Sequence, residues 1–421
     1  MTKKIKWAAI QPLTGGFYIG ARNAIGGDAE FILSYKGNND YKTNENGDIT
    51  TAGNEYSLTC WLKKQNANVP YYIFDRTMFQ NDFDMNTNIY NNDVIVKPNY
   101  DDLDLVIAVP VCSGLSMVTS AKDETKMLRN CNMLYITKYT LSVIKPKTYV
   151  FENAPTLMGS RGIEIREKLE KLAHDNGYCI TYYKTDTILH SNCQRRPRTF
   201  IIFVKGTTAI DMDFEDNTID LTTYLSYIPE DATQKINIEL SPLNKMLLSY
   251  VKNIFGIYWR DLSNKRPLQD IVTKKEYGEF IKFVKNNEEL NDVEKTKLIK
   301  FITHAEYKKS IGMNFMSTDI YITDNTVPSI QFKNMLSALH PTEDRLFNIR
   351  ENLHFMGMPH DFELQGNVLK EYNKIGQNVP VKTSEFIISQ IINHIKQEKH
   401  ITDMADNKTI RYIDNIKQEK H

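Results

Sequence analysis

Residues 104–116 read DLVIAVPVCSGLS, and this stretch decides how the rest of the chain is interpreted. The apolar run ends at Pro110, and a thiol, Cys112, follows in a loop of glycine and serine. A short apolar run between turn residues predicts a strand that is buried on both faces, as in a parallel sheet. Ligands of such sheets bind at the carboxyl ends of the strands. The sequence therefore places Cys112 where chemistry is expected.

Similar apolar runs alternate with amphipathic stretches through the first half of the chain. The predicted strands are 7–10, 30–34, 103–109, 148–151 and 200–204, and the predicted helices are 126–144 and 163–176, the second ending at Gly177. This alternation predicts an α/β fold with a doubly wound, mostly parallel sheet and helices on both of its faces.

The chain of 421 residues is too long for one compact core and predicts two domains. We expect a catalytic domain over 1–206 with an insertion at about 40–90, and a smaller recognition domain over 207–330, which is rich in lysine between 244 and 310. Residues 331–400 then return to the first domain. The tail, 401–421, repeats IKQEKH from 395–400 at 416–421, and the sequence assigns it no function.

The composition and the distribution of apolar residues argue against several classes of protein. The net charge is zero, and the five cysteines form no CxxC pair, so neither a zinc site nor a disulfide framework is indicated. No run of 18 apolar residues occurs, and the basic N-terminus lacks the apolar stretch of a signal peptide. We expect a cytoplasmic monomer without metal or membrane contact.

Two further polar groups adjoin predicted strands. Glu152 and Asn153 follow the run at 148–151. Apolar surroundings raise the pKa of a carboxyl group, which suits a group that must hold or deliver a proton. Arg196 and Arg198 precede the run at 200–204 and would share one face of an extended chain, where guanidinium groups could hold phosphates or a base carbonyl. Taken singly, each is equally compatible with a solvated strand end, as Cys112 is with a buried thiol.

In order and spacing, however, the three groups resemble the DNA cytosine-5 methyltransferase family. Pro-x-Cys-x-Gly-x-Ser at 110–116 is followed by Glu-Asn-x-Pro at 152–155 and by Gln-x-Arg-x-Arg at 194–198. The similarity extends to the end of a glycine-rich cofactor loop at 14–17, to Arg350-Glu351, to FMGMP at 355–359 with Asp361-Phe362, and to the last motif, IGQNVP at 375–380, which in the family folds back on the cofactor site. The gap at 207–326 falls where the family has a variable target-recognition region.

The resemblance implies a role for each group. Cys112 would add to C6 of a cytosine flipped out of double-stranded DNA, and Glu152 would hydrogen-bond N3 and the exocyclic amine. Arg198 would bind near O2, with Arg196 supporting the loop or the DNA backbone. C5 would then accept the methyl group of S-adenosylmethionine. The cofactor contacts would come from Gln11, Pro12, Leu13, Thr14, Gly15, Gly16, Phe17, Tyr35, Asp93, Pro110, Gln377 and Asn378.

The cofactor side departs from the family pattern. Gln11 and Leu13 stand where the family has Phe and a first Gly, and Ser34-Tyr35-Lys36 provides no acid for the cofactor ribose. Asp93 is the candidate acid for the adenine. Next to the nucleophile, Val111 and Ser113 replace the usual Pro and Gln.

These departures leave four interpretations open. The first is a divergent DNA methyltransferase that uses the same cofactor. The others are an RNA cytosine-5 methyltransferase of the same fold, transfer of a non-methyl group from a modified cofactor, and a cofactor-impaired DNA-binding homologue.

Overall fold

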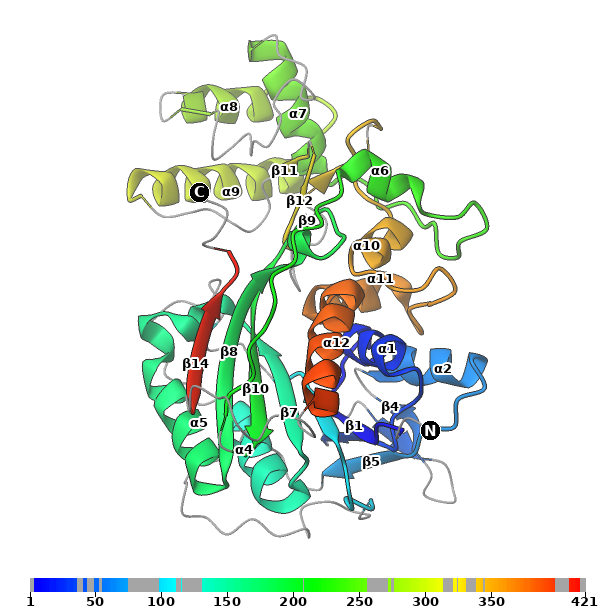
Figure 1. Cartoon of the computed structure of the whole chain (residues 1–421). Helices are drawn as coiled ribbons and strands as arrows, with labels where there is room; N and C mark the ends of the chain where they lie inside the picture. Colours follow the sequence, from blue (N-terminus) through cyan, green and yellow to red (C-terminus); the bar gives the residue numbers. More distant parts are fainter. Residues whose placement is uncertain are drawn as a thin grey trace.

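The computed structural model describes residues 4–35, 41–43, 49–52, 55–74, 98–110, 115, 131–206, 208–255, 272–273, 276–312, 321–323, 325–330, 338–343, 345–397 and 409–416. Its centre is an eight-stranded sheet in the order β14-β8-β10-β7-β6-β1-β2-β5 (Figure 1). The strands are β1 (Trp7–Ile10), β2 (Ile32–Tyr35), β5 (Tyr71–Phe74), β6 (Leu105–Ala108), β7 (Thr148–Asn153), β8 (Tyr178–Asp186), β10 (Pro197–Lys205) and β14 (Ile410–Asp414). β10 runs antiparallel to both neighbours, and the other paired strands of the sheet are parallel.

The central strands are apolar because both of their faces are covered. In β1, Trp7 and Ala9 belong to the hydrophobic cluster on one face of the sheet, and Ala8 and Ile10 belong to the cluster on the other. This arrangement is the reason that the strand reads as a continuous apolar run rather than as an alternating one. The predicted α/β fold class is confirmed.

Helices form the two outer layers (Figure 1). One layer holds α1 (Gly16–Ile25), α2 (Tyr56–Lys64) and α12 (Val381–Gln397), and the other holds α4 (Cys131–Tyr139), its π-helical extension (Thr140–Ile144) and α5 (Ile163–Asp175). α12 packs along α1, so the C-terminal return covers the start of the chain. Residues far apart in sequence therefore meet beside the loop that follows β1.

A largely helical segment separates β10 from this return. It contains α6 (Leu221–Ser226), α7 (Pro242–Phe255), α8 (Glu276–Lys285) and α9 (Asp292–Ser310), followed by the short strands β11 (Tyr321–Ile322), β12 (Val327–Pro328) and β13 (Ala338–Leu339). β12 pairs with β9 (Gln194–Arg195), which ties the segment to the sheet. The return continues through α10 (Ile349–Phe355), α11 (Val368–Glu371) and a 3-10 helix (Tyr372–Gln377). Within the described ranges, no helix is long and apolar enough to cross a membrane.

Several elements differ from the sequence expectation. Part of the expected insertion belongs to the fold: after the hairpin β3 (Tyr41–Thr43) and β4 (Ile49–Ala52), α2 leads into β5, which pairs with β2 at the edge of the main sheet. β8 was not expected, because its sequence, YCITYYKTD, is not an apolar run. The tail, to which the sequence assigns no function, supplies β14 at the opposite edge of the sheet.

Candidate active site

Glu152 and Arg198 meet at the edge of the sheet where β6 and β7 end and β10 begins. Arg198 Nε lies 2.6 Å from Glu152 Oε1, and Glu152 is only 5% exposed. Antiparallel pairing of Phe200 with Glu152 brings the start of β10 to the end of β7, so that Arg198, two residues before Phe200, reaches across. The structure thus brings together two of the three groups that the sequence singles out.

Cys112 lies outside the described residues, but its loop is bounded on both sides. β6 leads to the buried Pro110, and Leu115 is fully buried. The Thr156 hydroxyl, four residues after Glu152, donates a hydrogen bond to the Leu115 carbonyl. Leu115, three residues after Cys112 in the sequence, therefore lies beside the segment that follows Glu152.

Arg196 and Arg198 bond to different partners. Arg196 lies between β9 and β10, whereas Arg198 lies within β10. Arg196 is 2% exposed, and its guanidinium donates to the carbonyls of Ile330 (2.7 Å), Gly376 (2.9 Å) and Asn378 (2.8 Å). The Arg196 side chain therefore joins β10 to residue 330 and to the segment 376–378.

The same residues reach the loop after β1. The Gly16 N–H donates to Asn378 Oδ1 at 2.7 Å, and the Thr14 hydroxyl donates to the Lys374 carbonyl at 3.0 Å. A Cβ atom at Gly16 would stand 2.0 Å from the Val379 carbonyl oxygen, so only glycine fits there. The segment 375–380 folds onto the glycine loop, as the resemblance leads one to expect.

The backbone of this loop is left-handed at residues other than glycine. Leu13 has φ 53° and Gln11 has φ 51°, a conformation that costs a side-chain-bearing residue about 1 kcal/mol or more. Leu13 occupies the position where the family has glycine, which adopts this conformation freely. The loop therefore bends sharply without its first glycine.

The remaining cofactor candidates are less informative. Phe17 is fully buried, with its ring 5.9 Å from that of Phe200, so its side chain faces the core rather than an open site. Tyr35 ends β2, and Gln377 is half-buried beside Asn378. Asp93 lies outside the described residues.

Sequence reasoning missed Glu55. This carboxyl is 3% exposed and accepts hydrogen bonds from the hydroxyls of Ser34 in β2 and Tyr71 in β5, both at 3.2 Å. It also accepts from the main chain of Leu13, and burial raises its pKa to about 7. It thus lies between the ends of β1 and β2, where the family pattern calls for an acid. The available signal was an acidic residue directly before the amphipathic stretch 56–64.

Arg350 and Glu351 organise the C-terminal return. Arg350 is 1% exposed and donates to the carbonyls of Thr233, Pro359 and Phe362. Burial lowers its pKa to about 10. Glu351 receives both Nη atoms of Arg345, at 2.7 and 2.8 Å. These contacts fix the junction between the helical segment and the return.

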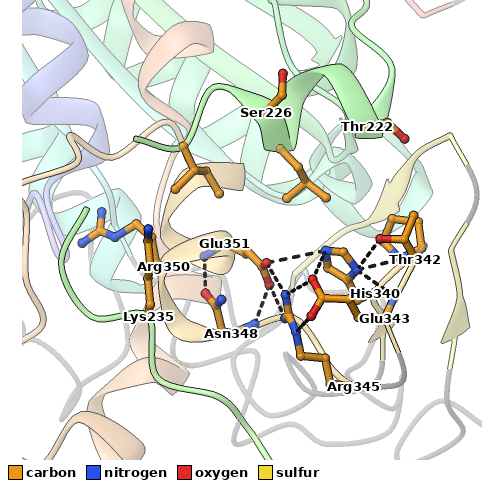
Figure 2. A pocket seen from close by; sticks show the side chains of 13 residues that line it. Thr222, Ser226, Lys235, His340, Thr342, Glu343, Arg345, Asn348, Arg350 and Glu351 are labelled. Atoms are coloured by element: carbon orange, nitrogen blue, oxygen red, sulfur yellow. Dashed lines mark hydrogen bonds and ion pairs between the residues drawn. The ribbon is translucent and has the colours of Figure 1, made fainter. Parts of the chain in front are cut away.

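A hollow of about 430 Å³ adjoins this junction (Figure 2). His340 Nε2 lies 3.6 Å from the Glu351 carboxylate and 3.7 Å from that of Glu343 (Figure 2). His340 Nδ1 accepts from the main-chain N–H groups of Thr342 and Glu343, and Arg345 bridges the two carboxylates. His340, Glu343, Arg345 and Glu351 thus form one connected group of polar side chains, which contacts α10 through Glu351. Across the parts of the chain that the structure describes, no group of three acidic, histidine or cysteine side chains is arranged to hold a metal ion.

Comparison with known proteins assigns the sequence to a family. The sequence model described as C-5 cytosine-specific DNA methylase matches residues 72–393. The chain belongs to this family. Members of the family use S-adenosylmethionine as methyl donor.

Two similar proteins carry type II methyltransferase names, one of them as putative. A putative type II methyltransferase of Methanocaldococcus jannaschii is 24% identical over 243 residues, which cover 58% of this chain and 59% of the relative. A type II methyltransferase of Escherichia coli is 23% identical over 266 residues, covering 60% of this chain and 55% of the relative. The match therefore spans less than two thirds of either relative.

Solved structures share the fold. A putative DNA modification methyltransferase from an E. coli prophage superposes with a TM-score of 0.50 at 14% identity, covering 93% of this chain and 99% of that one. A methyltransferase of Entamoeba histolytica gives a TM-score of 0.50 at 12% identity, covering 95% of this chain and 100% of that one. At these identities the likeness concerns the fold alone.

Proposed function

We propose that this chain is a DNA cytosine-5 methyltransferase that attacks a flipped-out cytosine with the thiol of Cys112. The observation that carries the proposal is the pairing of the buried Glu152 with Arg198 at the edge of the sheet, where Thr156, four residues after Glu152, bonds to Leu115. Membership of the cytosine-specific family supports the same reaction class.

The chemistry requires a nucleophile and a proton-holding group on one base. Cytosine C5 is a poor nucleophile until the 5,6 double bond is saturated, so the Cys112 thiolate forms a bond to C6. The displaced electron pair moves towards N3, where Glu152 holds the proton and accepts from the exocyclic amine. Arg198, which is bound to Glu152 and 20% exposed at its side chain, is placed to donate to the base carbonyl O2.

Completion of the reaction restores the ring. S-adenosylmethionine, when bound, would supply an electrophilic methyl group, which C5 would take as the methyl–sulfonium bond breaks and S-adenosylhomocysteine leaves. Loss of the C5 proton to a base then returns the electron pair to the 5,6 bond, and the C6–sulfur bond breaks to release the Cys112 thiolate. The base must leave the stacked duplex for this chemistry, at a cost of a few kcal/mol.

The residues beside β1 and β2 fit such a donor. We propose that Glu55 provides the acid for the donor's ribose hydroxyls, because it joins Ser34 of β2 to the main chain of Leu13. Gly15 and Gly16 would let the backbone approach the donor closely, and the hydrogen bond from the Gly16 N–H to Asn378 holds this part of the loop in position.

DNA would be held by the helical segment and the sheet edge together. α8 and α9 carry exposed lysines that suit phosphate contacts: Lys282, Lys285, Lys297 and Lys300. We propose that residues 207–330 form the target-recognition domain, with 331–400 completing the catalytic domain.

Nucleoside mass spectrometry of DNA from cells that express the wild type or Cys112→Ala tests the proposal. We expect 5-methylcytosine from the wild type and none from the variant. A heavier 5-substituted cytosine would indicate a different donor. Methylation of transfer RNA but not of duplex DNA would show that the substrate is RNA. No modified cytosine in either nucleic acid from folded wild type would contradict the enzyme assignment and favour a DNA-binding homologue.

A further inference from the structure

The C-terminal strand β14 lies at the outer edge of the sheet, beside β8 (Figure 1). The Ile180 N–H donates to the Thr409 carbonyl, and the Asn415 N–H donates to the Lys184 carbonyl, both at 2.9 Å. The ring of Tyr412 stacks on that of Tyr182, with centroids 5.0 Å apart. Main-chain and side-chain contacts therefore both fix the position of this strand.

Asn415 directly follows β14 and begins a chain of buried hydrogen bonds. It is 5% exposed, and its Nδ2 donates to Thr185 Oγ1 at 3.2 Å. Thr185 Oγ1 lies 2.7 Å from His190 Nε2, and His190 Nδ1 lies 2.9 Å from a carboxylate oxygen of Glu215. The imidazole thus links the two side chains, with Nδ1 facing the Glu215 carboxylate and Nε2 facing the Thr185 hydroxyl. Asn415 is the donor to the Thr185 oxygen.

This chain of hydrogen bonds borders the strand that carries Arg198. Thr185 is the β8 partner of Arg198 in the sheet register. The next residue, Asp186, accepts the Arg196 N–H at 2.6 Å, and the Thr187 N–H donates to the Arg196 carbonyl. His190 lies inside the turn that these bonds close. The tail thus contacts the β8 end of this turn directly, and the bonds of Asp186 and Thr187 to Arg196 connect that end to the start of β10.

We propose that residues 409–416 are a positioning element of the active site: Asn415, through Thr185 and His190, fixes the 186–196 turn and thereby holds Arg198 against Glu152. The role of Arg198 in a reaction rests on the proposed function. The effect of Asn415 on the position of the 186–196 turn does not rest on it. Asn415 is a positioning residue, since it acts on the reacting groups only through Thr185.

Three variants of the full chain and one truncation test this inference. Asn415→Ala removes the amide, and Asn415→Asp removes the donor at nearly constant shape. Asp414→Asn is the matched control, because it removes the charge from a part-exposed ion pair with Lys184 and keeps an oxygen that can accept from the Ile416 N–H. On duplex DNA we expect Asn415→Ala and Asn415→Asp to lower kcat by about five- to tenfold, the effect of one buried hydrogen bond, with KM for S-adenosylmethionine unchanged. Asp414→Asn should stay within about twofold of the wild type.

A chain that ends at Lys408 extends the test. A synthetic peptide of residues 409–421 should restore its activity, and the peptide should bind with the affinity at which activity returns. If the truncated chain fails to fold, as judged by circular dichroism, the point variants carry the test.

Hydrogen exchange provides a readout that does not depend on catalysis. Amides of residues 186–198 should exchange faster in Asn415→Ala than in Asp414→Asn. Wild-type kcat together with unchanged exchange over 186–198 in Asn415→Ala would overturn the inference. If the wild type transfers no methyl group, the proposed function fails, and exchange alone decides: faster exchange in Asn415→Ala supports the coupling, and unchanged exchange refutes it.

Discussion

Replacing Glu55 by glutamine tests the cofactor side of the site through stability and binding together. Burial raises the pKa of the Glu55 carboxyl from 4.5 to about 7. Between these values the folded chain binds more protons than the unfolded chain, so the free energy of unfolding falls as the pH rises. A difference of about 2.5 pKa units corresponds to about 3 kcal/mol. The cost of ionising Glu55 is absent below pH 4.5 and fully present above pH 7.

Urea unfolding at pH 5 and pH 7.5 measures this effect. The wild type and Glu55→Gln should differ little at pH 5, where the wild-type carboxyl is largely neutral. At pH 7.5 the variant should be the more stable of the two by up to about 3 kcal/mol, because it has no charge to bury. Its affinity for S-adenosylmethionine should fall about tenfold or more, because charge-assisted hydrogen bonds to the donor are lost.

Glu363→Gln is the matched control, since it removes a more exposed carboxylate paired with Lys64 of the same helix, α2. It should leave donor affinity and the pH dependence of stability unchanged. Parallel stability–pH curves for the wild type and Glu55→Gln, together with equal donor affinities, would refute both the buried charge and its role in binding.

Two other substitutions test the contacts of Gly16 and Arg196 with the C-terminal segment 375–380. Arg196→Met leaves three buried carbonyls without their donor, so we expect a loss of about 3 kcal/mol in urea unfolding and weaker donor binding by calorimetry; a loss below about 1 kcal/mol would contradict these contacts. Gly16→Ala places a Cβ 2.0 Å from the Val379 carbonyl oxygen and should lower stability by about 2 kcal/mol and abolish measurable donor binding. Gly278→Ala, where nothing lies within 4 Å of the added atom, is its control.

The strands that are continuous apolar runs could be predicted from the sequence, whereas the buried but polar-rich β8 and the edge strand β14 could not. β1 coincides with the predicted run at 7–10, because its four side chains all enter a core. β8 mixes Tyr, Thr and Lys, and β14 is half exposed, so neither produces an apolar run. Their pairing depends on contacts between Tyr412 and Tyr182 that no local pattern reveals.

Some residues of the candidate site could also be predicted from the sequence, and others could not. Glu152 and Arg198 could be chosen from the sequence because each adjoins an apolar run. Glu55 could not, because about twenty residues separate it from β2, and its contacts with Ser34 and Leu13 exist only in the folded chain. Arg196 resembles Arg198 in sequence, and only the folded chain shows that Arg196 bonds to carbonyls of distant segments whereas Arg198 pairs with Glu152.

Trapping of the covalent adduct tests the central claim most directly. Fluorine at C5 cannot leave as a proton does, so a cytosine that has gained both the thiol and the methyl group stays attached to the enzyme. A random-sequence duplex in which every cytosine carries 5-fluorine, incubated with S-adenosylmethionine, should give a protein–DNA adduct in the intact mass spectrum. Peptide mapping should place it on Cys112, and Cys112→Ala should form none. Absence of an adduct with wild-type protein that methylates ordinary DNA, or an adduct on Cys60, Cys131, Cys179 or Cys193, would contradict the account.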